Sequence, residues 1–250
     1  GEAHVSGDQR EVLPTDSQKN TVFAFAEEKD LHSIEELALA LGDHFVDTVP
    51  AAEGARVAIE EYAWDRIEVD GVGHDHSFVR SDSGRRTTVV DVDTSGPERV
   101  AHVVSGITDL TLLKSTGSEF HGFLTDRYTT LPETHDRILA ISLVARWRYD
   151  SAATRRGAVD WDASYDAIRS LLLQRFAEIH SQALQQTLHG MGEAVLERHG
   201  EVAEIRFAAP NKHHFLVDLE PFGLDNPGEV FHAADRPYGL IEASVVRDDA

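Results

Sequence analysis

The chain has 250 residues and a mass of 27.6 kDa, and 41% of its residues are hydrophobic, enough to build one large domain or two small ones. Cysteine is absent, which excludes disulfides, thiolate metal sites and cysteine nucleophiles. The 23 basic and 44 acidic side chains give a net charge of −21, which disfavours binding to nucleic acid or anionic lipid, and no apolar run is long enough to span a membrane.

The first predicted element is a helix. Residues 30–49 carry apolar side chains at helical spacing. Ser33 is its predicted N-cap, and Glu36, three residues later, completes a capping box. The preceding residues 1–14 have neither the basic start nor the apolar stretch of a secretory signal.

Two β segments follow this helix. They cover residues 56–67 and 77–94, and the turn-forming residues 70–76 between them predict a hairpin. The first half therefore has a helix followed by paired strands.

The second half begins with two more predicted strands. An apolar β stretch covers residues 104–116, and a second strand starts near Arg137. In the second strand, apolar side chains alternate with polar ones, which predicts one buried face made of Leu139, Ile141, Leu143, Ala145, Trp147 and Tyr149.

Two helices and two strands complete the second half. Helical spacing covers residues 166–199, and because this is long for one globular helix, we divide it at Ser181, a good N-cap. The closing strands are predicted at 204–219 and 239–248. The order of elements predicts an α+β fold of two similar units, 1–97 and 98–250, with the first unit lacking its opening strand pair.

Three polar features could bind a ligand. Asn211 and His213 lie two residues apart in a predicted strand and should share one face. The amides that follow Ser181 have no helical acceptor if Ser181 is the N-cap. Gln185 can donate and accept hydrogen bonds at the edge of a heterocycle. The structural alternative remains open for each, because a strand histidine is often simply hydrogen-bonded and a helix glutamine is often solvated.

Other chemistries find little support in the sequence. The pair His74 and His76 and the pair His213 and His214 are the obvious candidates for metal binding, but adjacent strand residues point to opposite faces and no zinc motif is present. A serine-hydrolase elbow, a phosphate loop and a dinucleotide fingerprint are also absent. We therefore expect no metal.

Residues 110–137, LTLLKSTGSEFHGFLTDRYTTLPETHDR, resemble the signature stretch of the urate oxidase family. Four further blocks agree in the family's order: PTDSQKN at 14–20, DGVGHDHSF at 70–78, ALQQT at 183–187 and PNKHHF at 210–215. The resemblance spans nearly the whole chain.

The resemblance implies two tandem T-fold units, each an antiparallel β-sheet backed by helices. It also implies cofactor-free, metal-free oxidation of urate by O2 and water to 5-hydroxyisourate and hydrogen peroxide. The family acts as a homotetramer with its sites at subunit interfaces. The sequence does not end in a peroxisomal signal, so a cytoplasmic location is expected.

By its motifs, the resemblance also assigns residues to the urate site. Phe120 should stack on the purine, Arg137 should clamp it through two hydrogen bonds, and Leu184 (through its amide) and Gln185 should hold the opposite edge. Asn211 resembles the residue that holds O2 or water above the ring. These groups suit urate, because a planar anion is recognised by an aromatic face, a guanidinium fork and fixed amide donors.

The remaining assigned residues concern proton transfer and the second subunit. Thr15 and His213 resemble two members of a proton relay, and Thr15 and the backbone amide of Asp16 should reach the substrate from a neighbouring subunit. The family's relay also contains a lysine near the start of the first strand, for which this chain has no counterpart among Lys19, Lys29, Lys114 and Lys212. We therefore expect slower turnover than in a chain with that strand, and the alternative function is a catalytically impaired purine-binding T-fold protein.

Overall fold

The computed structural model describes residues 2–29, 32–82, 84–151, 154, 159–234, 236 and 238–247. Asp30, where the first predicted helical segment begins, and the C-terminal residues 248–250 lie outside the described residues. The elements in chain order are α1 (Glu2–Val5), α2 (Thr15–Glu28), α3 (Ile34–Thr48), β1 (Gly54–Glu61), β2 (Trp64–Val69), β3 (Val72–Arg80), β4 (Arg85–Asp93), β5 (Val100–Lys114), β6 (Leu139–Tyr149), α4 (Trp161–Glu178), α5 (Leu184–Arg198), β7 (Val202–Pro210), β8 (His214–Leu216), the 3-10 helix η1 (Glu220–Phe222), β9 (Phe231–Ala233) and β10 (Leu240–Val246).

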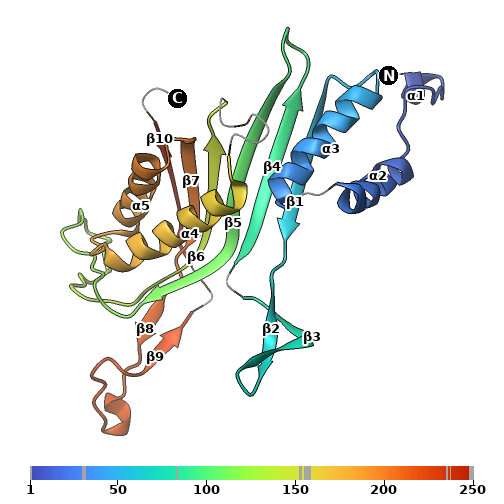
Figure 1. Ribbon diagram of the computed structural model, residues 1–250. Helices are drawn as coiled ribbons and strands as arrows, with labels where there is room; N and C mark the ends of the chain where they lie inside the picture. The colour runs from blue at the N-terminus through green and yellow to red at the C-terminus, as the bar shows by residue number, and fades with distance from the viewer. Residues whose placement is uncertain are drawn as a thin grey trace.

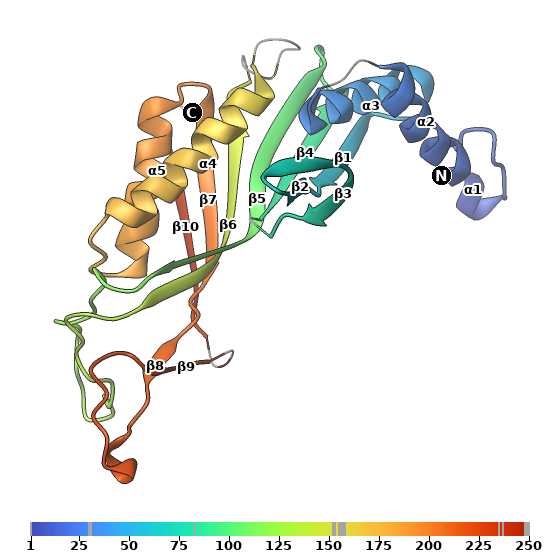
Figure 2. The same cartoon turned by 60° about the horizontal axis from the view of Figure 1, so that its bottom comes forward.

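One antiparallel sheet forms the centre of the molecule. Its strand order is β1-β4-β5-β6-β7-β10, and α3, α4 and α5 lie across one face of it (Figures 1 and 2). The α+β class with an antiparallel sheet backed by helices is therefore confirmed. Strands β4 and β5 pair across the predicted boundary at residue 97, so the sheet continues from one half into the other. The division into units 1–97 and 98–250 stays a prediction.

The helix α3 begins as the sequence predicts. The Ser33 hydroxyl accepts a hydrogen bond from the Glu36 amide at 3.2 Å, while the Glu36 carboxylate accepts one from the His32 amide at 2.9 Å. Both interactions satisfy amides that have no helical partner. By contrast, the helix α2 is not predicted from the sequence, because Thr15–Glu28 has no clear apolar stripe. In the structure none of its residues is buried.

The predicted hairpin forms, but each of its β segments bends into two strands. Strands β1 and β4 join the main sheet, whereas β2 and β3 form a separate hairpin that projects from it (Figure 1). The tight turn lies at Asp70 and Gly71, both with positive φ, as Asp-Gly turns of hairpins require. The histidines of 73–76 are consequently in strand β3, and their prediction as turn residues was wrong.

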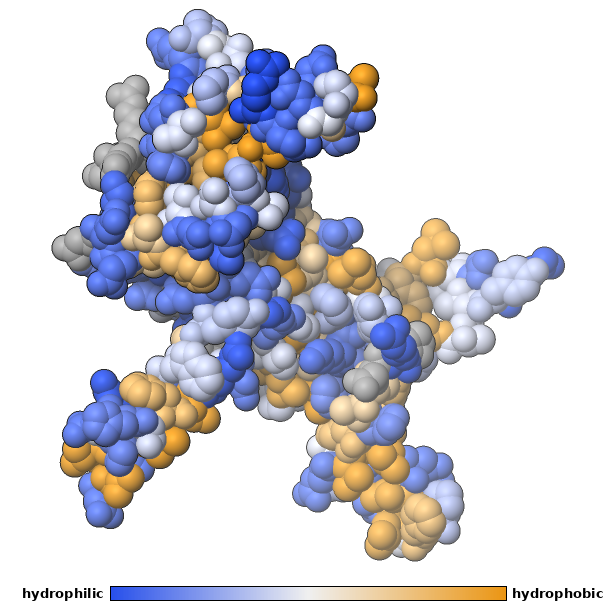
Figure 3. All heavy atoms as spheres, turned by 90° about the vertical axis from the view of Figure 1, so that its right-hand side faces the viewer, coloured by the Kyte–Doolittle hydropathy of each residue, from blue (hydrophilic) through white to orange (hydrophobic). Residues whose placement is uncertain are grey.

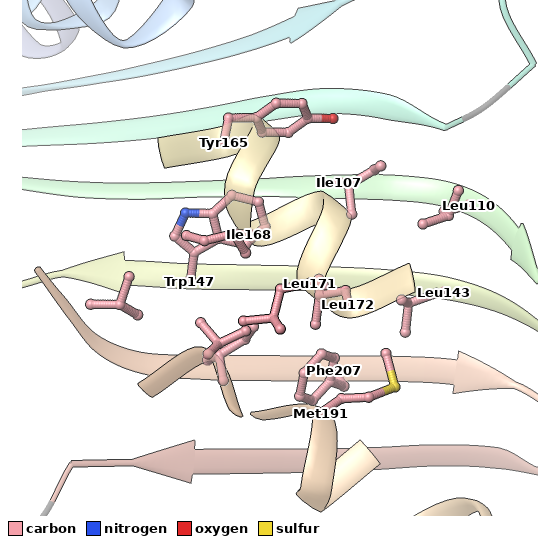
Figure 4. Packing of buried hydrophobic residues seen from close by; sticks show 14 of the residues in the cluster. Ile107, Leu110, Leu143, Trp147, Tyr165, Ile168, Leu171, Leu172, Met191 and Phe207 are labelled. Carbon is pink, nitrogen blue, oxygen red and sulfur yellow. The ribbon is translucent and has the colours of Figure 1, made fainter. Parts of the chain in front are cut away.

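The hydrophobic core lies between the sheet and helices α3, α4 and α5, and most of its residues come from the second half. Figure 4 shows Ile168 and Leu172 of α4 over β6, near Trp147 and Leu143, and Met191 of α5 beside Phe207 of β7. The alternate residues of β6 predicted to be buried are all fully or almost fully excluded from solvent. This confirms the period-two pattern of the strand. The β6 strand anchors the segment that precedes it, residues 115–137.

The closing segment 204–219 is not one strand. Strand β7 ends at Pro210, and the short strand β8 pairs with β9 in a second projecting hairpin. None of the helices in the described part of the chain has the length and apolar character that a membrane crossing requires.

The core predicts a contrast between two positions on α5. Leu188 is fully buried, so Leu188→Ala removes apolar contacts and leaves a cavity, which should lower the free energy of unfolding by about 2–5 kcal/mol. The exposed Glu197 lies on the same helix, and Glu197→Ala should change the free energy of unfolding by no more than about 0.5 kcal/mol. Denaturant unfolding at equal protein concentration measures both. Equal losses would contradict this account of the core.

Candidate active site

The segment between β5 and β6 folds back on itself. Phe120 and Thr134 form an antiparallel bridge in which each amide donates to the other's carbonyl, at 2.7 and 3.0 Å. The Arg137 amide donates to the Ser118 carbonyl at 2.8 Å. These bonds place the two predicted substrate contacts, Phe120 and Arg137, side by side.

A second bridge joins this segment to the start of α5. Ser118 pairs in parallel with Ser181, whose amide donates to the Gly117 carbonyl at 2.9 Å. The backbone of Ser181 is thus held in a strand-like contact, and its hydroxyl accepts a hydrogen bond from Thr187 at 2.8 Å. The prediction that Ser181 is the N-cap was wrong, because the N-cap of α5 is Ala183.

The amides at the start of α5 are free for a ligand, although two residues later than predicted. The first hydrogen bond of the helix runs from the Thr187 amide to the Ala183 carbonyl at 3.1 Å, so the amides of residues 184–186 have no helical acceptor. Leu184 has a buried side chain, whereas the Gln185 side chain is exposed. A backbone donor and a side-chain amide therefore lie next to each other at this helix end, where the helix dipole favours electron-rich groups.

The Arg137 guanidinium lies over the Phe120 ring, and none of the described residues forms an ion pair with it. Its central carbon is 5.3 Å from the ring centroid, and Phe120 in turn stacks on Phe123 at 5.0 Å. The Arg137 side chain is half-buried, its Nε is buried without a hydrogen-bond acceptor, and no carboxylate among the described residues forms an ion pair with it. Burial accordingly lowers its pKa. A desolvated cation beside an aromatic face is suited to a planar anion.

Asn211 and His213 are near the same end of the sheet, but not as a strand would place them. Asn211 bridges to Ile141 of β6, and the Lys212 amide donates to the Ala140 carbonyl at 2.7 Å. His213 lies between β7 and β8, and its ring stacks on Phe215. The prediction of one shared strand face was wrong because β7 ends at Pro210.

Thr15 and Asp16 are far from this cluster within one chain. They begin helix α2, which lies on the opposite side of the molecule from the segment 115–137 in both views (Figures 1 and 2). The Asp16 carboxylate is engaged by Lys19 at 2.7 Å, but the Asp16 amide precedes the first helical bond and has no helical acceptor. Both residues are exposed, so they are available to a second chain.

Several other residues of the signature stretch serve the structure. The Lys114 ammonium donates to the Ile179 carbonyl at 2.5 Å, and burial lowers its pKa. The Thr116 hydroxyl and the Gly117 amide both donate to the Asp136 carboxylate, at 2.8 and 3.1 Å. These bonds tie the ends of the segment together.

One cluster of possible metal ligands is not indicated by any spacing in the sequence. Glu119, His121 and His135 place one ligand atom each within 4.8 Å of one another. The candidate histidine pairs in the sequence are close neighbours along the chain, whereas this set comes together through the bridge between residues 120 and 134. Only knowledge of that pairing would have revealed it.

Comparison with known proteins identifies one family. The family model described as Uricase matches residues 2–91 and 103–242. A uricase of Arthrobacter globiformis is 54% identical over 98% of this chain and 77% of its own length, and a uricase of Danio rerio is 36% identical over 98% of this chain and 81% of its own length.

Solved structures give the same result for the fold. The crystal structure of uricase from Arthrobacter globiformis superposes with a TM-score of 0.90 at 53% identity, covering 100% of this chain and 82% of the other. A uricase structure from Bacillus fastidious gives a TM-score of 0.85 at 27% identity, covering 99% of this chain and 78% of the other.

Proposed function

The chain belongs to the uricase family and oxidises urate, and we propose that Phe120, Arg137, Leu184, Gln185 and Asn211 form its half of a urate site shared between two chains. The observation that carries this proposal is the half-buried guanidinium of Arg137, which lies over an aromatic ring without a counter-ion among the described residues. A bound urate anion supplies the missing charge.

Urate recognition in this proposal combines three kinds of contact. The purine stacks on Phe120, and the guanidinium of Arg137 donates two parallel hydrogen bonds to a carbonyl oxygen and ring nitrogen of urate. At the opposite edge, the free amide of Leu184 and the side chain of Gln185 donate and accept hydrogen bonds. The bridge between Ser118 and Ser181 supports this arrangement, since it joins the two segments that carry these groups.

The second chain contributes the start of its helix α2. The Asp16 amide, which has no helical acceptor, holds the edge of urate, and the Thr15 hydroxyl lies next to it. In this arrangement both edges of the purine face helix N-termini, α5 of one chain and α2 of the other. Their dipoles favour the anion.

The reaction consumes urate, O2 and water and gives 5-hydroxyisourate and hydrogen peroxide. We infer that Asn211 holds O2 or water above the ring, and that Thr15 and His213 relay protons. A threonine hydroxyl is a poor base unless a neighbour accepts its proton, which gives His213 or a further base a role. The lysine that the family resemblance places in this relay stays a prediction, as does the cytoplasmic location. No finding favours the alternative of a catalytically impaired purine-binding protein.

Assembly into a homotetramer is part of the same proposal. In the described part of the chain, the edge strands β1 and β10 each have only one hydrogen-bonded neighbour, and open edges favour pairing with other chains. The two projecting hairpins carry hydrophobic residues on their surfaces (Figure 3), including Trp64 at 58% exposure, Val72 at 70% and Phe215 at 52%. Apolar surface of this kind marks sites of association.

The first prediction of this proposal concerns Arg137. Arg137→Ala removes the charge-assisted contact and should raise the dissociation constant of a non-oxidisable purine analogue at least about tenfold, which is ~1.4 kcal/mol. Isothermal titration calorimetry measures this dissociation constant. Arg127→Ala, in the same segment but exposed, is the matched control and should bind like the parent protein. If Arg137→Ala bound the analogue as tightly as the parent protein, the proposed role of Arg137 would be wrong.

A second prediction tests whether each site is shared. Chains with Thr15→Ala and chains with Arg137→Ala should each oxidise urate poorly. When the two are co-expressed with different tags and purified as mixed oligomers, random pairing should restore roughly a quarter of the sites. Urate turnover should therefore recover in the mixture only. A mixture as inactive as its parents would show that Thr15 does not reach Arg137 of another chain.

A third prediction concerns metal. We propose that the oxidation itself needs no metal, because none of the groups assigned to urate is a typical metal-ligand set. Exhaustive chelation followed by dialysis should leave urate turnover unchanged at temperatures well below unfolding, relative to a sample dialysed without chelator. Loss of turnover that one particular metal restores would refute this.

A further inference from the structure

A cluster of two imidazoles and a carboxylate lies directly behind the Phe120 position. The ligand atoms of Glu119, His121 and His135 are all within 4.8 Å of one another. The two histidine rings are 4.5 Å apart between centroids, and His121 Nε2 is 3.4 Å from Glu119 Oε1. Both histidines are exposed to solvent, so an ion can reach them.

The backbone explains why these side chains converge. Phe120 and Thr134 are directly paired in an antiparallel bridge, so the flanking residues Glu119, His121 and His135 project to the other side of the paired segments. The cluster therefore faces away from the aromatic face that the proposed urate site uses. Its ligands come from both strands of the folded-back segment.

The carboxylate of the cluster is already held in place. Glu119 Oε2 is 3.4 Å from His180 Nε2, and its Oε1 faces His121. The Glu119 amide also donates to the Ser181 carbonyl at 2.8 Å. Orientation of a ligating carboxylate by an outer partner is a common feature of metal sites. His180 can stay in contact with one oxygen of the Glu119 carboxylate while the other oxygen binds an ion.

We propose that Glu119, His121 and His135 bind a divalent transition-metal cation, for which Zn²⁺ is the natural probe. Two imidazole nitrogens and one carboxylate oxygen are a ligand set that Zn²⁺ accepts at about 2.0–2.2 Å, with water completing the coordination. Modest rotations of the exposed side chains bring the ligand atoms to that spacing. Mg²⁺ and Ca²⁺ prefer sets made only of oxygen and should not bind here.

The metal has a structural role that is independent of urate oxidation. A bound ion cross-links residues 119–121 to residue 135, and so holds together the two strands that carry Phe120 and Arg137. Because the ion binds the folded arrangement of these ligands, it stabilises the folded protein. This inference does not depend on the proposed urate contacts.

The test uses the full, metal-stripped protein and Zn²⁺ alone. Isothermal titration calorimetry should show a single Zn²⁺ per chain, and Mg²⁺ under the same conditions should show none. His121→Ala and His135→Ala should each weaken Zn²⁺ binding at least tenfold. His189→Ala is the matched control. His189 is an exposed histidine that also lies beside a glutamate, at 3.2 Å from Glu193, but no third ligand joins this pair among the described residues. This variant should bind Zn²⁺ like the parent protein.

Two further readouts keep the proposal falsifiable. Zn²⁺ should raise the Tm of the parent protein and of His189→Ala, but not of His135→Ala, while circular dichroism shows that all variants are folded. Co²⁺ should give the absorption of a nitrogen- and oxygen-ligated site in the parent protein, and His135→Ala should lose it. The proposal is overturned if the parent protein does not bind Zn²⁺, or if His121→Ala and His135→Ala bind it as tightly as His189→Ala.

Discussion

The site depends on a positive charge that the described part of the chain leaves uncompensated. The guanidinium of Arg137 is half-buried over Phe120, and no carboxylate among the described residues pairs with it, in a protein with a net charge of −21. Removing a cation from water without a partner costs free energy, which the fold must supply. A planar anion bound on Phe120 recovers this cost, and urate has both the shape and the charge.

The scaffold maintains this arrangement through a few backbone contacts. The segment 115–137 has little regular structure, and its position depends on the bridges from Phe120 to Thr134 and from Ser118 to Ser181. On one side it continues into β6, a largely buried strand, and on the other it adjoins the start of α5. The buried core thus fixes the position of the irregular segment 115–137. This segment and the amides at the start of α5 can therefore form a binding site.

The sequence predicts those parts of the fold that depend on local patterns. The alternation in β6 and the capping box at Ser33 involve neighbouring residues, and both are present in the structure. The N-cap of α5 could not be predicted, because Ser181 instead forms a parallel bridge with Ser118, more than sixty residues earlier in the chain. His213 was likewise assigned to a strand that ends at Pro210, and the pairing that groups His121 with His135 is not encoded in any spacing. The family resemblance supplied residue roles that periodicity alone could not.

A crystal structure of the assembled protein with a non-oxidisable purine analogue tests the central claim most directly. The account predicts that the purine stacks on Phe120 and accepts two hydrogen bonds from Arg137, with Thr15 of a second chain at its far edge. Binding elsewhere would contradict it, for instance in the cavity of about 750 Å³ lined by Trp64 and Arg85, with the Arg137 guanidinium still unpaired.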